Sequence, residues 1–232
     1  MSIAANIALH SFADGDTLAA ALAQTVADNL RAALNERGTA TLALSGGNTP
    51  KRFFQALSRQ SLDWAKVTVT LVDERWVGED SERSNAALVR AILLQHEAAA
   101  ANFLPLYRAN TEVEQALPAI ETTLAPRLPL DVAVLGMGAD GHTASYFPGG
   151  DRLTEALDPA TPARVLPMRA PGAGEPRITL TLPVLLAARH LYLHIEGAEK
   201  RTVLERAVAG DDLPIRAVLQ HFQAVLPAYW CP

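Results

Sequence analysis

The feature of this sequence that most limits its fold is a repeated alternation between short, β-branched apolar runs and longer stretches with helical periodicity. Runs typical of strands cover residues 7–12, 41–44, 67–72, 103–106, 131–135, 177–182 and 190–195. Strands that alternate with helices are typical of βαβ units, which build a mostly parallel sheet. The sequence therefore predicts an α/β fold, an open sheet with helices on both faces.

The clearest helix is an Ala-rich stretch that we expect to be N-capped by Asp16 and Thr17. Apolar residues recur at every fourth position up to Leu34, which predicts one buried face. Gly38 is placed to end this helix near Arg37. Further helices are expected at 50–57, 85–95, 112–124, 183–188, 199–209 and 215–219.

The second half of the chain is harder to interpret, because prolines interrupt every helical pattern between residues 157 and 177. We expect mobile loops there, lying over the functional site. No internal repeat and no shift in composition marks a linker. A single domain over residues 1–232 is therefore expected.

Composition excludes several functional classes. The formal net charge is −5, so the chain lacks the basic excess of a nucleic-acid-binding protein. No apolar run approaches the roughly 18 to 20 residues that span a bilayer, and residues 1–12 lack the basic start of a secretion signal. The one cysteine, Cys231, has no intrachain partner and is expected to be inert. These features predict a cytoplasmic protein, a monomer or weak homo-oligomer.

The first segment with functional character runs Leu42-Ala-Leu-Ser-Gly-Gly-Asn-Thr-Pro50, a strand that turns through two glycines into a helix. Pro50 suits the first helical position and Thr49 can cap the helix. Glycines let a ligand approach the backbone, whose N–H groups converge at the positive end of the helix dipole. The segment predicts a phosphate site, although a turn that binds nothing has the same pattern. Its candidate ligands are Ser45, Gly46, Gly47, Asn48 and Thr49.

The second segment is Thr70-Leu-Val-Asp-Glu-Arg-Trp-Val77, in which a β-branched run ends at Asp73, Glu74 and Arg75. Ligands of open α/β sheets bind outside the carboxyl ends of the strands. Charged residues at this place therefore favour a functional role, the alternative being a solvated turn with one ion pair.

The third segment opens a buried-looking strand into Gly136-Met-Gly-Ala-Asp-Gly-His142. Its glycines match the dinucleotide-binding pattern, but Asp140 would repel a pyrophosphate in this turn, and the next acidic residues do not end a strand. We therefore reject a nucleotide cofactor. Asp140 and His142 instead offer an acid and an imidazole on one ligand face, and a histidine is a natural general base near neutral pH.

Two cations complete the candidate site. Arg177 opens a strand and Lys200 lies at a strand-to-helix junction, where they can close on a phosphate as a bidentate fork and as a point charge. His190 and His194 are about 13 Å apart on an extended strand of roughly 3.3 Å per residue, too far to share a metal. No metal is expected, and the serines lack the surroundings of a hydrolase nucleophile.

These segments resemble the signature segments of bacterial 6-phosphogluconolactonases, namely Leu44-Ser-Gly-Gly-Asn-Thr-Pro50, Val72-Asp-Glu-Arg75 and Leu135-Gly-Met-Gly-Ala-Asp-Gly-His-Thr-Ala-Ser145. The later segments Arg177-Ile-Thr-Leu-Thr and Gly197-Ala-Glu-Lys200 also fit, so the resemblance spans nearly the whole chain. It implies a Rossmann-like sheet related to glucosamine-6-phosphate deaminases, no bound nucleotide, and hydrolysis of 6-phosphoglucono-1,5-lactone in the pentose phosphate pathway.

The same resemblance separates the lactonases from the deaminases. Phe147 stands where the deaminase pattern has a glutamate that assists ring opening, and Arg75 stands where it has a tyrosine. Both departures favour the lactonase. A deaminase or isomerase on this scaffold, and a non-catalytic sugar-phosphate sensor, remain as alternatives.

The mechanism expected from these residues places the substrate phosphate on the 45–49 loop, clamped by Arg177 and Lys200. His142 then takes a proton from the water that attacks the lactone carbonyl.

Arg75, with backbone amides of the 136–141 turn, is expected to stabilise the resulting oxyanion. Either Asp140 or Asp73 could orient the imidazole or the water, and the sequence leaves both open.

Overall fold

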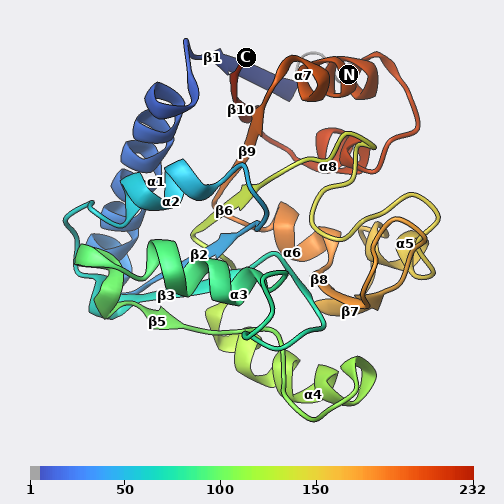
Figure 1. Cartoon of the computed structure of the whole chain (residues 1–232), viewed down its shortest axis with the longest axis horizontal. Coiled ribbons are helices and arrows are strands. Elements are labelled where there is room, and N and C mark those ends of the chain that lie inside the picture. The colour runs from blue at the N-terminus through green and yellow to red at the C-terminus, as the bar shows by residue number, and fades with distance from the viewer. Residues whose placement is uncertain (1–5) are drawn as a thin grey trace.

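The main sheet of the computed structural model, which describes residues 6–232, confirms the predicted α/β class. Seven strands of the described residues pair in parallel throughout, in the order β1-β10-β9-β6-β2-β3-β5 (Figure 1). Their bounds are β1 (Ile7–Ser11), β2 (Ala40–Leu44), β3 (Val67–Leu71), β5 (Asn102–Phe103), β6 (Val132–Leu135), β9 (His190–Glu196) and β10 (Leu226–Cys231).

Strand β10 has no counterpart among the predicted strands. It lies inside the sheet, between β1 and β9, although it contains Pro227. Pairing with β9 begins only at Ala228, so Pro227 lies where β10 has one neighbour, and its missing N–H does not interrupt the second ladder. Cys231 ends this strand and is buried there rather than on a free tail, and burial raises the pKa of its thiol.

Most helices agree with the predicted ranges, but the predicted helix at 85–95 is α-helical only over Asn85–Leu88 and continues as a π-helix over Val89–Leu93. The short helix Leu153–Ala156 was not predicted, and the first N-cap differs from the prediction. The N-cap of α1 is Asp14, whose carboxylate accepts the backbone N–H of Thr17. The prediction of Asp16 and Thr17 as caps was therefore wrong, because the cap lies two residues before Asp16. Gly38 ends α1 in the left-handed conformation, as predicted. The helices are α1 (Gly15–Arg37), α2 (Lys51–Leu57), α3 (Asn85–Leu88), α4 (Val113–Leu124), α5 (Leu153–Ala156), α6 (Leu182–Leu186), α7 (Ala198–Ala209) and α8 (Ile215–His221).

Helices flank the main sheet. Helix α1 packs against α2 and against β2, β6 and β10, while α7 packs on β9 and α8 contacts both α6 and α7 (Figure 1). Strands β2, β3 and β6 are buried along their whole length, as expected for parallel strands that are covered on both sides.

The strand order places a topological switch point between β2 and β6. These two strands are neighbours, but the chain leaves β2 through α2 toward β3 on one side, whereas β9 pairs with β6 on the other side. Ligands of open α/β sheets bind outside the carboxyl ends of the strands at such a point. The two glycine-rich loops that follow β2 and β6 begin there.

A second, antiparallel sheet contradicts part of the sequence analysis. Its strands β4 (Asp73–Arg75), β8 (Arg177–Leu180) and β7 (Val165–Met168) pair in that order. The expectation of loops throughout 157–177 is therefore wrong for β7, because Pro167 is tolerated in a strand at the edge of a sheet. Pairing of β4 with β8 sets Arg75 opposite Arg177.

Within residues 6–232, no helix is both long and apolar enough to cross a membrane. The interpretation of residues 1–12 as lacking a secretion signal falls partly on residues 1–5, which lie outside the described residues.

Candidate functional site

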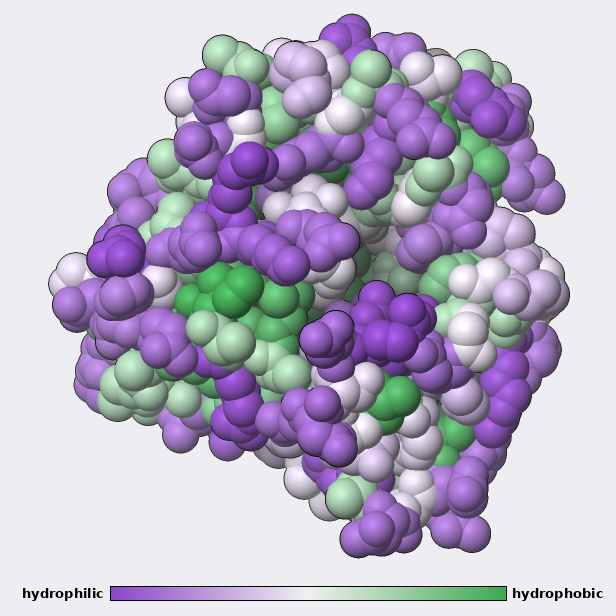
Figure 2. All heavy atoms as spheres, viewed as in Figure 1, coloured by the Kyte–Doolittle hydropathy of each residue, from purple (hydrophilic) through white to green (hydrophobic). Residues whose placement is uncertain are grey.

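A cavity of about 210 Å³ lies at the switch point, at the carboxyl ends of β2 and β6. Figure 2 shows this face of the molecule hollowed near its middle, with hydrophilic side chains along the rim. The cavity is lined by all three predicted segments and by both predicted cations, so the strand ends converge as expected. The predicted residues that line it are Ser45, Gly46, Gly47, Asn48, Thr49, Asp73, Arg75, His142, Arg177 and Lys200.

The loop after β2 is held in place by contacts with two other segments. The hydroxyl of Ser45 accepts the backbone N–H of Gly136 at 2.9 Å, which joins the two glycine-rich loops. A Cβ on Gly46 would lie 1.8 Å from Oδ1 of Asn85, so this glycine makes room for the Asn85 side chain rather than for a ligand. Gly47 has a φ of 93°, a conformation that favours glycine.

The predicted cap of α2 is wrong. No side chain caps this helix, and Pro50 itself is the N-cap residue. The hydroxyl of Thr49 instead accepts a hydrogen bond from Nζ of Lys200 at 3.1 Å. Lys200 is thereby fixed against the loop, and burial lowers the pKa of its ammonium group.

The loop after β6 presents His142 to the cavity. Nδ1 of His142 lies 2.5 Å from Oδ1 of Asp140, which also accepts the backbone N–H of His142 at 3.1 Å. Gly138 has no room for a side chain, because a Cβ would lie 2.3 Å from the imidazole. The ring of Phe147 packs on the imidazole with 4.3 Å between ring centres. Asp140 itself does not line the cavity, and its contact with the site is its hydrogen bond to His142.

Three backbone N–H groups of the 136–141 turn already donate hydrogen bonds within the protein. Besides the bond from Gly136 to Ser45, the N–H of Gly138 binds the carbonyl of His142 and the N–H of Gly141 binds the carbonyl of Gly138. These three groups are therefore not oxyanion donors in this conformation.

The small antiparallel sheet carries the two arginines. The guanidinium of Arg75 donates to the carbonyl of Arg83, and its Nε is the only buried side-chain nitrogen or oxygen of residues 6–232 without a hydrogen-bond partner. A buried donor without a partner is costly. Nε itself has no accessible surface, so a ligand in this cavity meets Arg75 through the rest of its guanidinium.

Arg177 is almost fully buried, which lowers the pKa of its guanidinium group. Nε and Nη2 both donate to the carbonyl of Ala173, and Nη1 lies 3.8 Å from Oδ2 of Asp73. One edge of the guanidinium is therefore occupied, and Nη1 is the nitrogen left for a ligand. Its Cζ lies 5.2 Å from the centre of the Phe147 ring, the ring that packs on His142.

Asp73 and Glu74 have different surroundings, although they are adjacent. Oδ2 of Asp73 accepts the hydroxyl of Ser145 at 2.6 Å, whereas the hydrogen bond of the His142 ring is to Asp140. Glu74 is fully buried and its carboxylate accepts the backbone N–H groups of Arg75, Asn85 and Ala86. Burial raises the pKa of Glu74. Asp73 belongs to the cavity wall, whereas Glu74 anchors the start of α3.

Sequence analysis missed two polar residues of the cavity, Asn85 and His194. His194 was considered only as a metal ligand. Its place two residues before the end of a strand, close in sequence to Lys200, is a signal that could have identified it. Asn85 carried no such signal, because only its contact with Gly46 and its bond to the Asp73 carbonyl bring it to the cavity.

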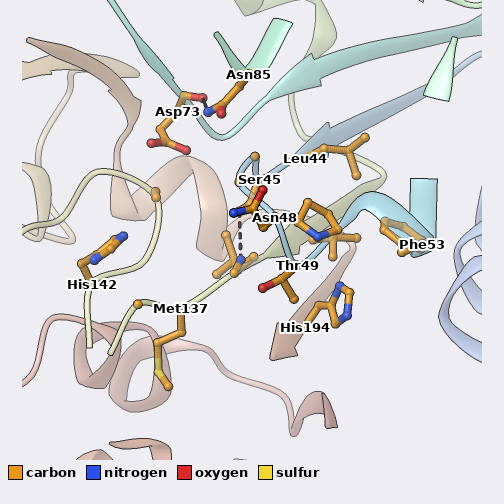
Figure 3. A pocket seen from close by; sticks show the side chains of 18 of the residues that line it. Leu44, Ser45, Asn48, Thr49, Phe53, Asp73, Asn85, Met137, His142 and His194 are labelled. Atoms are coloured by element: carbon orange, nitrogen blue, oxygen red, sulfur yellow. Dashed lines mark hydrogen bonds between the residues drawn. The ribbon is translucent and has the colours of Figure 1, made fainter. Parts of the chain in front are cut away.

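The cavity has two ends, and Figure 3 shows His142 and His194 on different sides of the β2 loop. We call the end formed by Arg75, His142 and Arg177 the His142 end. We call the end formed by Thr49, His194 and Lys200 the Lys200 end. Among residues 6–232, no group of three or more His, Cys, Asp or Glu side chains is close enough to hold a metal ion.

Comparison with known proteins identifies the family. Residues 13–226 match the family model described as glucosamine-6-phosphate isomerases/6-phosphogluconolactonase. The chain is 54% identical over 229 residues to a 6-phosphogluconolactonase of Rhizobium meliloti strain 1021, covering 97% of this chain and 98% of the relative. It is 52% identical over 225 residues to a 6-phosphogluconolactonase of Mesorhizobium japonicum, covering 96% and 94%.

Solved structures agree with this result. The crystal structure of a 6-phosphogluconolactonase from Shewanella baltica OS155 superposes with a TM-score of 0.93 at 39% identity, covering 97% of this chain and 98% of that one. A 6-phosphogluconolactonase structure from Trypanosoma brucei, at 23% identity and a TM-score of 0.82, shares the fold. The chain therefore belongs to the glucosamine-6-phosphate isomerase/6-phosphogluconolactonase family.

Proposed function

We propose that this chain hydrolyses 6-phospho-D-glucono-1,5-lactone to 6-phospho-D-gluconate, a step of the oxidative pentose phosphate pathway. The observation that carries this proposal is an oriented imidazole, His142, that faces the same cavity as Lys200. The relatives that match over nearly their whole length have the same activity in their names, which supports the choice of substrate.

His142 is the proposed general base. A carboxylate that contacts Nδ1 favours the tautomer with the proton on that nitrogen, so Nε2 has a free lone pair. Nε2 takes a proton from water as the water oxygen bonds to C1 of the lactone. The imidazolium then gives that proton to the ring oxygen as the C1–O bond breaks. Asp140 is the positioning residue in this proposal, because Asp73 is bonded to Ser145 instead.

Arg75 is the proposed donor to the oxyanion. Its positive charge and its place in the cavity wall support this role, since the amides of Gly136, Gly138 and Gly141 are occupied. Arg177 remains a proposed substrate ligand at the His142 end, acting through Nη1. A fixed cation near the carbonyl stabilises the charge that develops there.

Lys200 is the proposed phosphate ligand, together with the loop from Ser45 to Thr49. The bond from Lys200 to Thr49 places the ammonium group beside this loop. Helix α2 has only 7 residues, so we attribute phosphate binding to the side-chain charge more than to the helix dipole.

The lactonase is favoured over the deaminase by Phe147. This ring packs directly on His142, where a ring-opening deaminase would need a carboxylate partner for the histidine. The expectations of one domain over residues 1–232 and of a monomer or weak homo-oligomer in the cytoplasm stand as proposals.

Two assays on the purified chain test the proposed function. Lactone opening is followed in a pH-stat and corrected for the spontaneous rate, and ammonia release from glucosamine 6-phosphate is measured in parallel. We expect acceleration of lactone opening and no ammonia. Ammonia release without lactone hydrolysis would identify a deaminase, and tight 6-phosphogluconate binding without either activity would identify a sensor.

A further inference from the structure

A second histidine lies in the cavity at the end opposite His142. His194 is on β9, is only 2% exposed, and lines the cavity beside Thr49 (Figure 3). Its ring packs edge-on against Phe53, with 6.0 Å between ring centres. The proposed mechanism gives this imidazole no role.

Hydrogen bonding fixes one of its two nitrogens. Nε2 of His194 lies 3.2 Å from Oε1 of Glu196, and this bond lowers the pKa of the Glu196 carboxyl group. Glu196 is therefore ionised at neutral pH, and Nε2 carries the proton that it donates to the carboxylate.

The other nitrogen faces the cavity. Among residues 6–232, Nδ1 of His194 has no hydrogen-bond partner. Unlike Nε of Arg75, it keeps some accessible surface. Because the residue is otherwise buried and lines the cavity, the accessible part of the ring lies inside it. Nδ1 is thus placed to meet a ligand, as an acceptor when neutral or as a donor when protonated.

The carboxylates around His194 outnumber the cations when its ring is neutral. Arg52 contacts Glu196 at 3.4 Å and Asp16 at 3.1 Å, while Glu196 also interacts electrostatically with Lys200. The titratable and charged groups that surround this end are Asp16 on α1, Arg52 on α2, Glu196 on β9, Glu199 and Lys200 on α7, and Tyr229 and Cys231 on β10. Two cations and three carboxylates leave a negative charge, so a phosphate dianion has no net counter-charge there.

We propose that His194 is a phosphate ligand that becomes protonated as the substrate binds. The imidazolium donates Nδ1–H to a phosphate oxygen and Nε2–H to Glu196. The added proton comes from solvent and offsets one negative charge at the Lys200 end. The identity of the ligand as a sugar phosphate rests on the proposed function, whereas proton-linked binding of phosphate does not.

Proton uptake tests this directly. Titration calorimetry with 6-phosphogluconate, and separately with inorganic phosphate, is run at about pH 7.5 in buffers of different ionisation enthalpy, since histidine exchanges its proton near this pH. We expect the wild-type chain to take up a measurable fraction of a proton per ligand. The uptake should vanish in His194→Asn and His194→Gln, but not in the matched control His221→Asn, whose side chain is exposed on α8.

Kinetics separate a ligand from a packing residue. His194→Asn should raise KM for the phosphorylated lactone roughly 10- to 100-fold, the range of a hydrogen bond between charged groups, with kcat unchanged. The rate with unphosphorylated glucono-lactone should not change. An equal loss with both lactones, or wild-type proton uptake in both variants, would overturn the proposal.

The outcomes also distinguish this inference from the proposed function. If the wild-type chain opens the lactone but takes up no proton with either ligand, the role of His194 is wrong and the lactonase stands. If phosphate binding depends on protonation of His194 but no lactone is opened, His194 stands as a phosphate ligand and the lactonase is wrong.

Discussion

The two ends of the cavity are built in different ways. At the His142 end, the imidazole is held by Asp140, two residues away on the same loop. At the Lys200 end, Thr49 and Lys200 are joined across 151 residues of sequence, and His194 comes from a further strand. A chemical group can thus be fixed by local turn geometry, whereas the charge that binds a ligand is assembled by the whole fold.

The largest expected effect tests the His142 end. His142→Ala should lower kcat for lactone hydrolysis roughly 10²- to 10⁴-fold, the usual contribution of a general base, and leave KM almost unchanged. The rate is measured in a pH-stat with the spontaneous rate subtracted. His221→Ala is the control, because that side chain is exposed on α8. A variant with the wild-type kcat would exclude His142 as the base.

The next effect tests the Lys200 end. Lys200→Met should raise KM roughly 10- to 100-fold, because it removes a charged donor to the phosphate, while kcat stays close to wild type. Initial rates over a range of substrate concentrations give both constants, with Lys66→Met, an exposed ion-pair residue, as control. If kcat falls and KM does not rise, the two ends do not have the separate tasks proposed for them.

A smaller effect is expected for the orientation of His142 by Asp140, measured as its contribution to kcat. Asp140→Asn should lower kcat only about two- to fivefold, because an exposed ion pair contributes no more than about 1 kcal/mol. Steady-state kinetics of Asp140→Asn beside His142→Ala measure the difference. A loss as large as that of the histidine variant would show that the carboxylate takes part in the reaction itself.

A fourth prediction concerns the stability of the loop after β2 rather than catalysis. Gly46→Ala should destabilise the protein by about 1–3 kcal/mol, because its Cβ would overlap the Asn85 side chain. For a chain of this length the thermal midpoint should fall by roughly 2–4 °C per kcal/mol. Thermal unfolding followed by circular dichroism gives this midpoint, and Gly172→Ala is the control, because a Cβ there meets no atom within 4 Å. Unchanged stability would show that Asn85 moves aside at little cost.

The smallest effect concerns acid stability at the Lys200 end. The pKa of Glu196 lies below its ordinary value of 4.5, chiefly because of its bond to His194. Since a lowered pKa means that the unfolded state binds more protons, this carboxylate stabilises the fold above about pH 4.5, and the gain is lost as the pH falls through the lowered value. Glu196→Gln should therefore be less stable than wild type by about 1 kcal/mol or less at neutral pH. Urea unfolding at several pH values should show the two proteins converging in acid, and a constant difference would contradict the assignment.

Local patterns account for most of what could be predicted. Period-two and period-3.6 apolar patterns located the main strands and helices, and strand-end glycines located both loops of the cavity. His142 and Asp140 were found together because one turn holds both. Their relation to each other needed no knowledge of the tertiary fold.

Pairings between distant residues could not be predicted in this way. Strand β4 has three residues and pairs with β8 about a hundred residues later, so no local periodicity reveals that Arg75 and Arg177 are opposite each other. The occupied edge of Arg177 depends on the carbonyl of Ala173, and the filled space at Gly46 depends on Asn85. The sequence led to residues that line the cavity, but it could not show which of their atoms are free to meet a ligand.

The hydrogen bond from Gly136 to Ser45 has a consequence for engineering this scaffold. Replacing the loop after β2 with a segment that lacks the serine hydroxyl would strip the Gly136 amide of its acceptor and loosen the turn that carries the imidazole. A graft intended to alter the choice of anion would then also damage the chemistry at the opposite end. New substrate preferences in this architecture are therefore best sought by exchanging both loops as one unit.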